Sequence, residues 1–282
     1  MKLFSLSVVL FATTALSAFH TENPLCVDTP TTQAVYAGHE KLAALEKNQT
    51  AFKDRINVDV YMNVVLSWGK AENISMEGIE SYIKALNDNF KAAEISFTLK
   101  KANWMINGDF SYGRANDEMR KQLHQGDAST LNIYLVESIG PNSILTGLAT
   151  FPTELKNPNG AVNDGVFLTQ YNSAVSLTHE VGHWFGLLHV FEDICNDDGD
   201  YIDDTPPSPE SCRSYPGACP GPNFMSFAVD GSVFTPDQMT RMRSFWKEYR
   251  ANSAGTPTDP GTPTDPDTPP DAGTEAPGGE AS

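Results

Sequence analysis

The sequence predicts an α+β domain, because segments with strand patterns come first along the chain and segments with helix patterns are interleaved later. Of its 282 residues, 40% are hydrophobic and 10% are aromatic, which is enough to build a sizeable core. Residues 56–66 (INVDVYMNVVL) are rich in β-branched side chains and partly alternating, as in a strand. Residues 75–93 carry apolar side chains at helical spacing behind a candidate N-cap, Ser75.

Further elements follow in chain order. Short apolar segments, several of them bounded by Gly, Pro and Asn, predict strands at 95–99, 131–136, 147–151 and 165–169. Helical spacing predicts helices at 117–123, 174–188 and about 236–249. A long loop rich in Asp, Pro, Ser and Cys separates the last two of these helices.

The two ends of the chain differ in composition from the part between them. Residues 1–18 begin with Met-Lys, continue as an apolar run too short to span a membrane, and end in small residues, which is the layout of a secretory signal peptide. Residues 254–282 repeat the hexapeptide Gly-Thr-Pro-Thr-Asp-Pro and have no bulky apolar residue, so we expect a disordered, acidic Pro/Thr-rich tail. The mature chain is therefore expected outside the cell and without a membrane span.

The net charge of the chain and its expected extracellular location limit the molecules that it can bind and the modifications that it can carry. The chain has 19 Lys and Arg against 36 Asp and Glu, a net charge of -17, which argues against binding to nucleic acid. An extracellular compartment permits disulfides, and in a eukaryotic host it permits N-glycans on the sequons at Asn48 and Asn73. We expect the protein to act as a monomer.

The strongest chemical signal lies within residues 178–189, which read THEVGHWFGLLH. His179 and His183 are four residues apart, so in a helix both imidazoles leave the same face and one zinc ion can bridge them. Glu180 is rotated by about 100° from His179 on that helix. It can therefore reach a water bound to the zinc instead of the metal itself, which is where a general base belongs.

A third histidine completes the motif. Gly186 permits a break in the helix, so the chain can bring His189 back to the same metal from outside the helical register. Three histidines leave the fourth position of a tetrahedral zinc open. An open position is typical of a catalytic zinc, whereas structural zinc sites fill all four positions with side chains.

At these residues the sequence resembles the metzincin metalloendopeptidases, whose extended motif HExxHxxGxxH is followed by a Met-turn. Met225, in the segment NFMS, matches that turn and would form a hydrophobic floor beneath the histidines. Within the metzincins, HEVGHWFGLLHVF, the Cys195 that follows, the acidic run DGDYIDDTP and PNFMSF look like the pappalysin family. The resemblance is strongest over residues 130–250.

The resemblance implies a fold and a division of the chain. The fold would be a metzincin-like zincin, with a twisted, mostly parallel sheet, an active-site helix, the Met-turn and a C-terminal helix. The catalytic domain would occupy residues 56–253, after a pro-segment at 19–55. By analogy with the family, a peptide substrate would lie extended along an edge strand such as 147–151.

Motif and resemblance together predict a secreted zinc metalloendopeptidase that hydrolyses peptide bonds of extracellular proteins. Glu180 would take a proton from the zinc-bound water as it attacks the carbonyl, and deliver that proton to the leaving amine. The alternatives are a secreted zinc-binding protein without efficient turnover and a wall-associated binding protein. Phe227 motivates the first alternative, since the family commonly has a Tyr there whose hydroxyl can support the oxyanion.

The cysteines leave two interpretations open. By resemblance Cys195 pairs with Cys219. Cys26 is similar to the Cys of a Cys-Gly-Thr segment in small pappalysin-like proteases, where the thiolate fills the fourth zinc position and keeps the zymogen inactive. A Cys26–Cys212 disulfide is the alternative, and it would leave no free thiol.

The acidic loop after the zinc motif suggests calcium as a second cofactor. Calcium takes six to eight oxygen ligands. The loop offers several such oxygens close together, from Asp198, Asp200, Asp203, Asp204 and Thr205. The pappalysin resemblance also implies calcium in this region, whereas the alternative from sequence alone is a solvated acidic loop.

Overall fold

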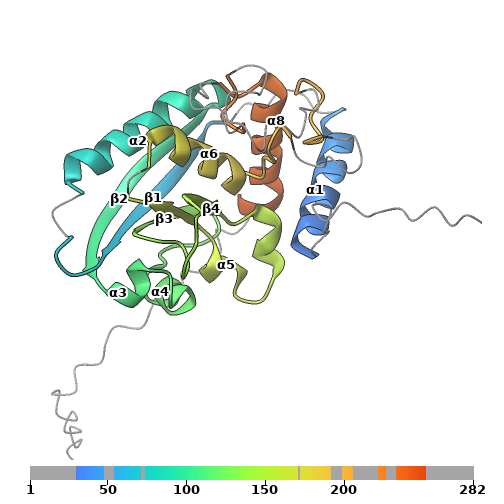
Figure 1. The fold of residues 1–282 in the computed structure, drawn as a ribbon. Coiled ribbons are helices and arrows are strands. Elements are labelled where there is room, and N and C mark those ends of the chain that lie inside the picture. The colour runs from blue at the N-terminus through green and yellow to red at the C-terminus, as the bar shows by residue number, and fades with distance from the viewer. Residues whose placement is uncertain are drawn as a thin grey trace, which may run out of the picture.

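The computed structural model describes residues 30–47, 54–70, 74–170, 172–191, 199–205, 222–226 and 233–251 (Figure 1). Its centre is a five-stranded sheet in the order β2-β1-β3-β5-β4. The first three strand pairs are parallel, and β4 runs antiparallel to β5 at one edge. The strands are β1 (Ile56–Leu66), β2 (Ile95–Ile106), β3 (Thr130–Val136), β4 (Gly147–Ala149) and β5 (Val166–Thr169). The predicted mixed fold with a mostly parallel sheet is thereby confirmed.

Helices lie on both faces of this sheet (Figure 1). The α-helices in the described residues are α1 (Pro30–Glu46), α2 (Met76–Phe90), α3 (Gly108–Ser111), α4 (Asn116–Leu123), α5 (Gly160–Asn163), α6 (Ala174–Trp184) and α8 (Pro236–Phe245). Shorter turns are the 3-10 helices η2 (Lys91–Ala93) and η3 (Pro152–Lys156) and the π-helical turn η4 (Trp246–Arg250). None of the helices in the described part of the chain is long and apolar enough to cross a membrane.

Two apolar clusters form the core, one on each face of the sheet. The larger cluster joins β1 and β3 to α2 and α6, and it includes Leu131 and Leu135. The smaller cluster contains Tyr134 and Val136, on the other face of β3, together with apolar residues of α3 and α4. All seven residues of β3 are buried, as expected for a central strand with a covered face on each side.

Local signals set most element boundaries. β1 has the predicted bounds, and Ser75 caps α2 by accepting a hydrogen bond from the backbone N–H of Gly78 at 3.2 Å. β2 extends beyond the predicted 95–99 because it pairs with β1 along its whole length. A register shift after Val60 leaves Lys100 outside this pairing.

Two expectations about element ends were wrong. The predicted 174–188 helix ends at Trp184, because the chain turns at Gly186. β4 ends at Ala149 instead of 151, because the 3-10 helix η3 begins at Pro152. A helix, α1, occupies part of the segment that the sequence suggested only as a pro-segment, and it packs beside α8 (Figure 1).

A buried ion pair fastens the C-terminal part of the chain to the sheet. Asp164 accepts two hydrogen bonds from the Arg250 guanidinium, at 2.8 and 3.1 Å, and one from the Trp184 indole at 2.9 Å. Both charged side chains are at most 1% exposed. The guanidinium also lies over the Trp184 ring, 3.6 Å from its centroid. This contact fixes the last residue of α6 between the start of β5 and the end of the C-terminal helix.

We therefore expect Asp164→Ala to lower the free energy of unfolding by about 3–5 kcal/mol, since it leaves the buried Arg250 charge without its counter-ion. Urea unfolding measures this. The matched control is Asp109→Ala, which removes an exposed ion pair with Arg114 and should cost no more than about 1 kcal/mol. Equal effects of the two substitutions would contradict the assignment of Asp164 as a structural anchor.

Candidate active site

Helix α6 carries the first two histidines of the site. Ser173 begins it, accepting a hydrogen bond from the backbone N–H of Ser176 at 3.2 Å. Leu177, Val181 and Trp184 are fully buried and anchor the helix in the larger core cluster. His179 and His183 project from the helix toward a cavity of about 460 Å³.

The chain leaves α6 by a turn that only glycine fits well. Gly186 has φ +98°, and a Cβ at this position would lie 2.4 Å from the Cδ2 atom of Phe245. Its N–H donates to the carbonyl of His183, and the N–H of Leu187 donates to the carbonyl of Gly182. The turn sends the chain back along the helix, so that His189 reaches the other two histidines as the sequence predicted.

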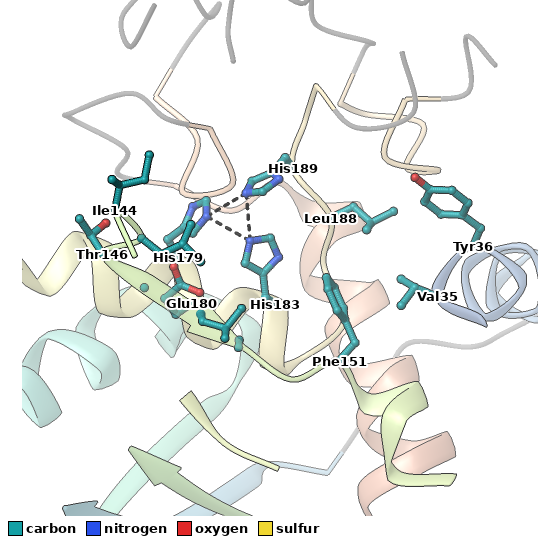
Figure 2. Close-up of a pocket in the computed structure, with 14 residues that line it drawn as sticks. Val35, Tyr36, Ile144, Thr146, Phe151, His179, Glu180, His183, Leu188 and His189 are labelled. Carbon is teal, nitrogen blue, oxygen red and sulfur yellow. Dashed lines mark hydrogen bonds between the residues drawn. The ribbon is translucent and has the colours of Figure 1, made fainter. Parts of the chain in front are cut away.

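The three imidazoles converge through their Nε2 atoms (Figure 2). The Nε2 of His183 lies 3.1 Å from that of His179 and 3.1 Å from that of His189, and the remaining separation is 3.2 Å. Two nitrogens on one tetrahedral zinc are about 3.3–3.4 Å apart when each Zn–N bond is about 2.0–2.1 Å. The triangle therefore has close to the size that zinc requires.

Protonation decides what this triangle can bind. The Nδ1 atoms of His179 and His183 each lie 2.7 Å from a backbone carbonyl, of Phe224 and of Leu187 respectively. A carbonyl can only accept, so both Nδ1 atoms carry the proton and both Nε2 atoms present a lone pair. Two lone pairs that face each other at 3.1 Å repel unless a cation lies between them. The residues present therefore fit a metal ion, and the carbonyls orient its ligands.

Met225 lies beneath this arrangement. It is fully buried, and a Cβ on Gly182 of α6 would lie 2.5 Å from its sulfur. Its backbone carbonyl accepts from the N–H of Val190, next to His189. The side chain of Asn223 accepts from the N–H of Met225 at 2.8 Å and so shapes the turn. The predicted Met-turn residue thus packs against α6 between His179 and His183 and is tied to the segment that follows His189.

Glu180 lines the same cavity as the histidines, together with Gly147 of the edge strand β4. Its side chain is largely buried. Burial raises the pKa of Glu180 to about 8, because desolvation disfavours the charged carboxylate. The positive charge of a nearby metal ion acts in the opposite direction and lowers this pKa. Most of the other cavity walls are apolar, including Ile144, Leu148 and Leu188.

The predicted calcium residues that the structure describes take part in two different sets of hydrogen bonds. Asp200 accepts from the Thr205 hydroxyl at 2.7 and 2.8 Å, and burial raises the pKa of Asp200 to about 7. Asp204 instead accepts from the Thr235 hydroxyl and the backbone N–H of Asp237 at the start of α8. Asp203 is exposed. Among the residues described, only the three histidines form a group of three or more His, Cys, Asp or Glu ligands close enough to hold a metal ion.

Several predicted residues lie outside the described part of the chain. They are Cys26, Asn48, Asn73, Cys195, Asp198, Cys212, Cys219 and Phe227, together with the signal-peptide and tail segments 1–18 and 254–282. The cysteine pairings, the cysteine switch, the glycans and the calcium site therefore stay predictions.

Helix α1 forms one wall of the cavity, which the sequence did not predict. Val35 and Tyr36, both in α1, line it beside Phe151 and Leu188. The buried residues of α1 are 35, 38, 39 and 42, which have the spacing of one helix face. Two of these residues are Gly38 and His39, which an apolar pattern does not detect.

Comparison with known proteins identifies relatives of the chain. A family model of Peptidase_M43, described as pregnancy-associated plasma protein-A, matches residues 114–247, which include all three histidines and Met225. An extracellular metalloprotease of Neurospora crassa is 33% identical over 243 residues, covering 77% of this chain and 84% of the relative. Extracellular metalloprotease 1 of Coccidioides posadasii is 32% identical over 240 residues, covering 77% of this chain and 87% of the relative.

A solved structure shares the fold. Mature mirolysin of Tannerella forsythia, in complex with a cleaved peptide, matches with a TM-score of 0.54 and 24% identity. The match covers 69% of this chain and 93% of the mirolysin chain.

The turn after α6 gives a test of the site's construction. We expect Gly186→Ala to lower Tm by at least about 5 °C and to reduce bound zinc, because a side chain there combines an unfavourable φ with contact against Phe245. Calorimetry and metal analysis measure the two effects. Gly78→Ala, in the first turn of α2 where a Cβ has room, should leave both unchanged or raise Tm slightly. Full zinc content in Gly186→Ala would show that the turn does not position His189.

Proposed function

This chain belongs to the pappalysin family of metalloproteases, hydrolases that act on proteins or peptides, and we propose that it is a secreted zinc endopeptidase with Glu180 as its general base. His179, His183 and His189 would hold the zinc. The observation that carries the proposal is the triangle of Nε2 atoms 3.1–3.2 Å apart, two of which present lone pairs. Secretion is supported by the layout of residues 1–18 and by relatives named extracellular metalloproteases.

The chemistry requires a Lewis acid and a proton carrier. His179, His183 and His189 would hold the zinc that, when bound, would act as a Lewis acid toward the scissile carbonyl and the attacking water. Glu180 accepts the proton that the attacking water loses, at a carboxylate oxygen. It then passes that proton to the nitrogen of the leaving amine as the C–N bond breaks. The apolar walls of the cavity strengthen these charge interactions by lowering the local dielectric.

The edge strand β4 is the proposed binding surface for the substrate backbone. β4 pairs with β5 on one side, and it is the last strand of the sheet on the other. All three of its residues line the cavity that contains Glu180. An extended peptide that added to this edge would receive backbone hydrogen bonds and pass directly over the histidines.

The non-catalytic alternatives have less support. Their motivating residue, Phe227, lies outside the described part of the chain. Glu180, in contrast, lines the cavity beside all three histidines, where a zinc-binding protein without turnover has no need of an acid. Membership of a family of proteases also favours the enzyme.

The decisive substitution is Glu180→Gln, which keeps the shape of the side chain and removes its ability to accept a proton. We expect casein hydrolysis to fall by about two to four orders of magnitude, while zinc content and Tm stay near the wild-type values. The matched control is Glu80→Gln, an exposed residue of α2, which should retain full activity. Wild-type activity in Glu180→Gln would exclude Glu180 as the base.

Calcium can be tested separately from zinc. If the 196–205 loop binds calcium, a calcium-selective chelator should lower Tm while zinc remains bound, because a ligand that binds only the folded state stabilises it. Calorimetry with parallel zinc analysis measures this. An unchanged Tm at saturating chelator would favour the solvated-loop interpretation, in which Asp204 serves only to cap α8.

A further inference from the structure

A second recess lies on the face of the sheet opposite to the histidines. Successive side chains of β1 point to opposite faces, so Asn63 and Val65 lie on the side of α3 and α4, whereas Val64 packs in the larger core cluster with α6 (Figure 1). The recess has a volume of about 290 Å³. Among the residues described, it shares no lining residue with the candidate active-site cavity, so a molecule bound there would leave the histidines accessible.

The two outermost strands on one side of the sheet form the floor and one wall of this recess. Asn63 of β1 pairs in register with Asn103 of β2, which is the edge strand. Lys101 and Met105 lie two residues before and after Asn103, so they belong to the same face of β2 and also line the recess. These four side chains are therefore held by the sheet itself.

The other wall follows the end of α4. Gln122 and Leu123 are the last two residues of this helix, and Gln125 follows it. The side chain of Asn132, in the central strand β3, fixes the turn: it accepts from the backbone N–H of Gln125 at 3.0 Å and donates to the carbonyl of Gln125 at 2.9 Å. Both walls are thus anchored to the sheet, and the recess is preformed.

Asn63 carries an unused hydrogen-bond donor at the floor of the recess. Its side chain is fully buried, and its Oδ1 accepts from the Nδ2 of Asn103 at 3.0 Å. Its own Nδ2 has no hydrogen-bond partner among the described residues. A buried amide N–H without a partner lowers stability, so folded proteins have few of them. A bound molecule that accepts a hydrogen bond would supply the partner.

The lining residues offer both donors and acceptors. The Nδ2 of Asn63 and the ammonium group of Lys101 are donors. Gln125 uses its Nε2 to donate to the carbonyl of His124 at 3.0 Å, which leaves its Oε1 as an acceptor. Asn103 uses its Nδ2 on Asn63 in the same way and retains its Oδ1. None of the described residues that line the recess is acidic.

We propose that this recess binds one sugar unit of a neutral carbohydrate. A hydroxyl group both donates and accepts, so adjacent hydroxyls on one ring match the mixed set of amide groups. A carboxylate or a phosphate only accepts, and it would face the oxygens of Asn103 and Gln125. Met105 and Leu123 add apolar surface for the C–H groups of the ring. The volume is at the lower end of the range for small-molecule sites, which suits a single ring.

Binding of sugars to the purified secreted protein tests this proposal without any measurement of hydrolysis. The probes are the methyl glycosides of glucose, mannose and N-acetylglucosamine, compared with glucuronate, inorganic phosphate and a tripeptide blocked at both ends. We expect at least one neutral sugar to bind with a Kd of about 1 mM, and the other three probes to bind at least tenfold more weakly. Failure of all three neutral sugars to bind, or tighter binding of glucuronate, phosphate or the tripeptide in the recess, would overturn the proposal.

Substitutions in the recess separate a binding role from a structural one. Asn63→Leu combined with Asn103→Leu replaces both members of the amide pair, and it should weaken sugar binding at least tenfold while Tm stays unchanged or rises. Lys101→Ala combined with Gln122→Ala changes only exposed residues and should weaken binding at least threefold. The matched control is Lys121→Ala, an exposed residue of α4 outside the recess, which should bind like the wild type. Wild-type affinity in the exposed double variant, or in a folded Asn63→Leu and Asn103→Leu variant, would overturn the assignment.

Discussion

The site depends on one unfavourable contact, in which the lone pairs of His179 and His183 face each other at 3.1 Å with His189 equally near. The protein enforces this arrangement from outside the motif. Backbone carbonyls of Phe224 and Leu187 hold the Nδ1 protons, and Met225 closes the space beneath α6. A cation at the centre of the three nitrogens would relieve this repulsion. The rest of the structure can be understood as the scaffold that holds the three nitrogens in place for a metal ion.

That scaffold draws on parts of the chain that are far apart in sequence. The end of α6 is held by Asp164 and Arg250 through Trp184, and the Gly186 turn is held by Phe245 and by His39. The third ligand therefore owes its position to the helices at both ends of the described chain. This explains how the short segment after Gly186 can place the Nε2 of His189 within hydrogen-bond distance of His179 and His183.

The sequence predicted what depends on local spacing. The histidine motif, the bounds of β1 and the Ser75 cap all follow from neighbours within a few residues. The sequence did not predict α1, because its buried face includes a glycine and a histidine whose partners, Phe245 and Arg241, lie about 200 residues away. The acidic loop shows the same limit. Asp204 in this loop accepts hydrogen bonds from Thr235 and Asp237 at the start of α8, a pairing that no local pattern reveals, and calcium binding by the loop stays a prediction.

The central claim is that a zinc ion occupies the centre of the Nε2 triangle. Crystals of the purified protein, measured on both sides of the zinc absorption edge, test this most directly. The account predicts one anomalous peak that appears only above the edge, about 2.0–2.1 Å from the Nε2 atoms of His179, His183 and His189. No peak at that point, or a peak bound through Nδ1 instead, would contradict the account.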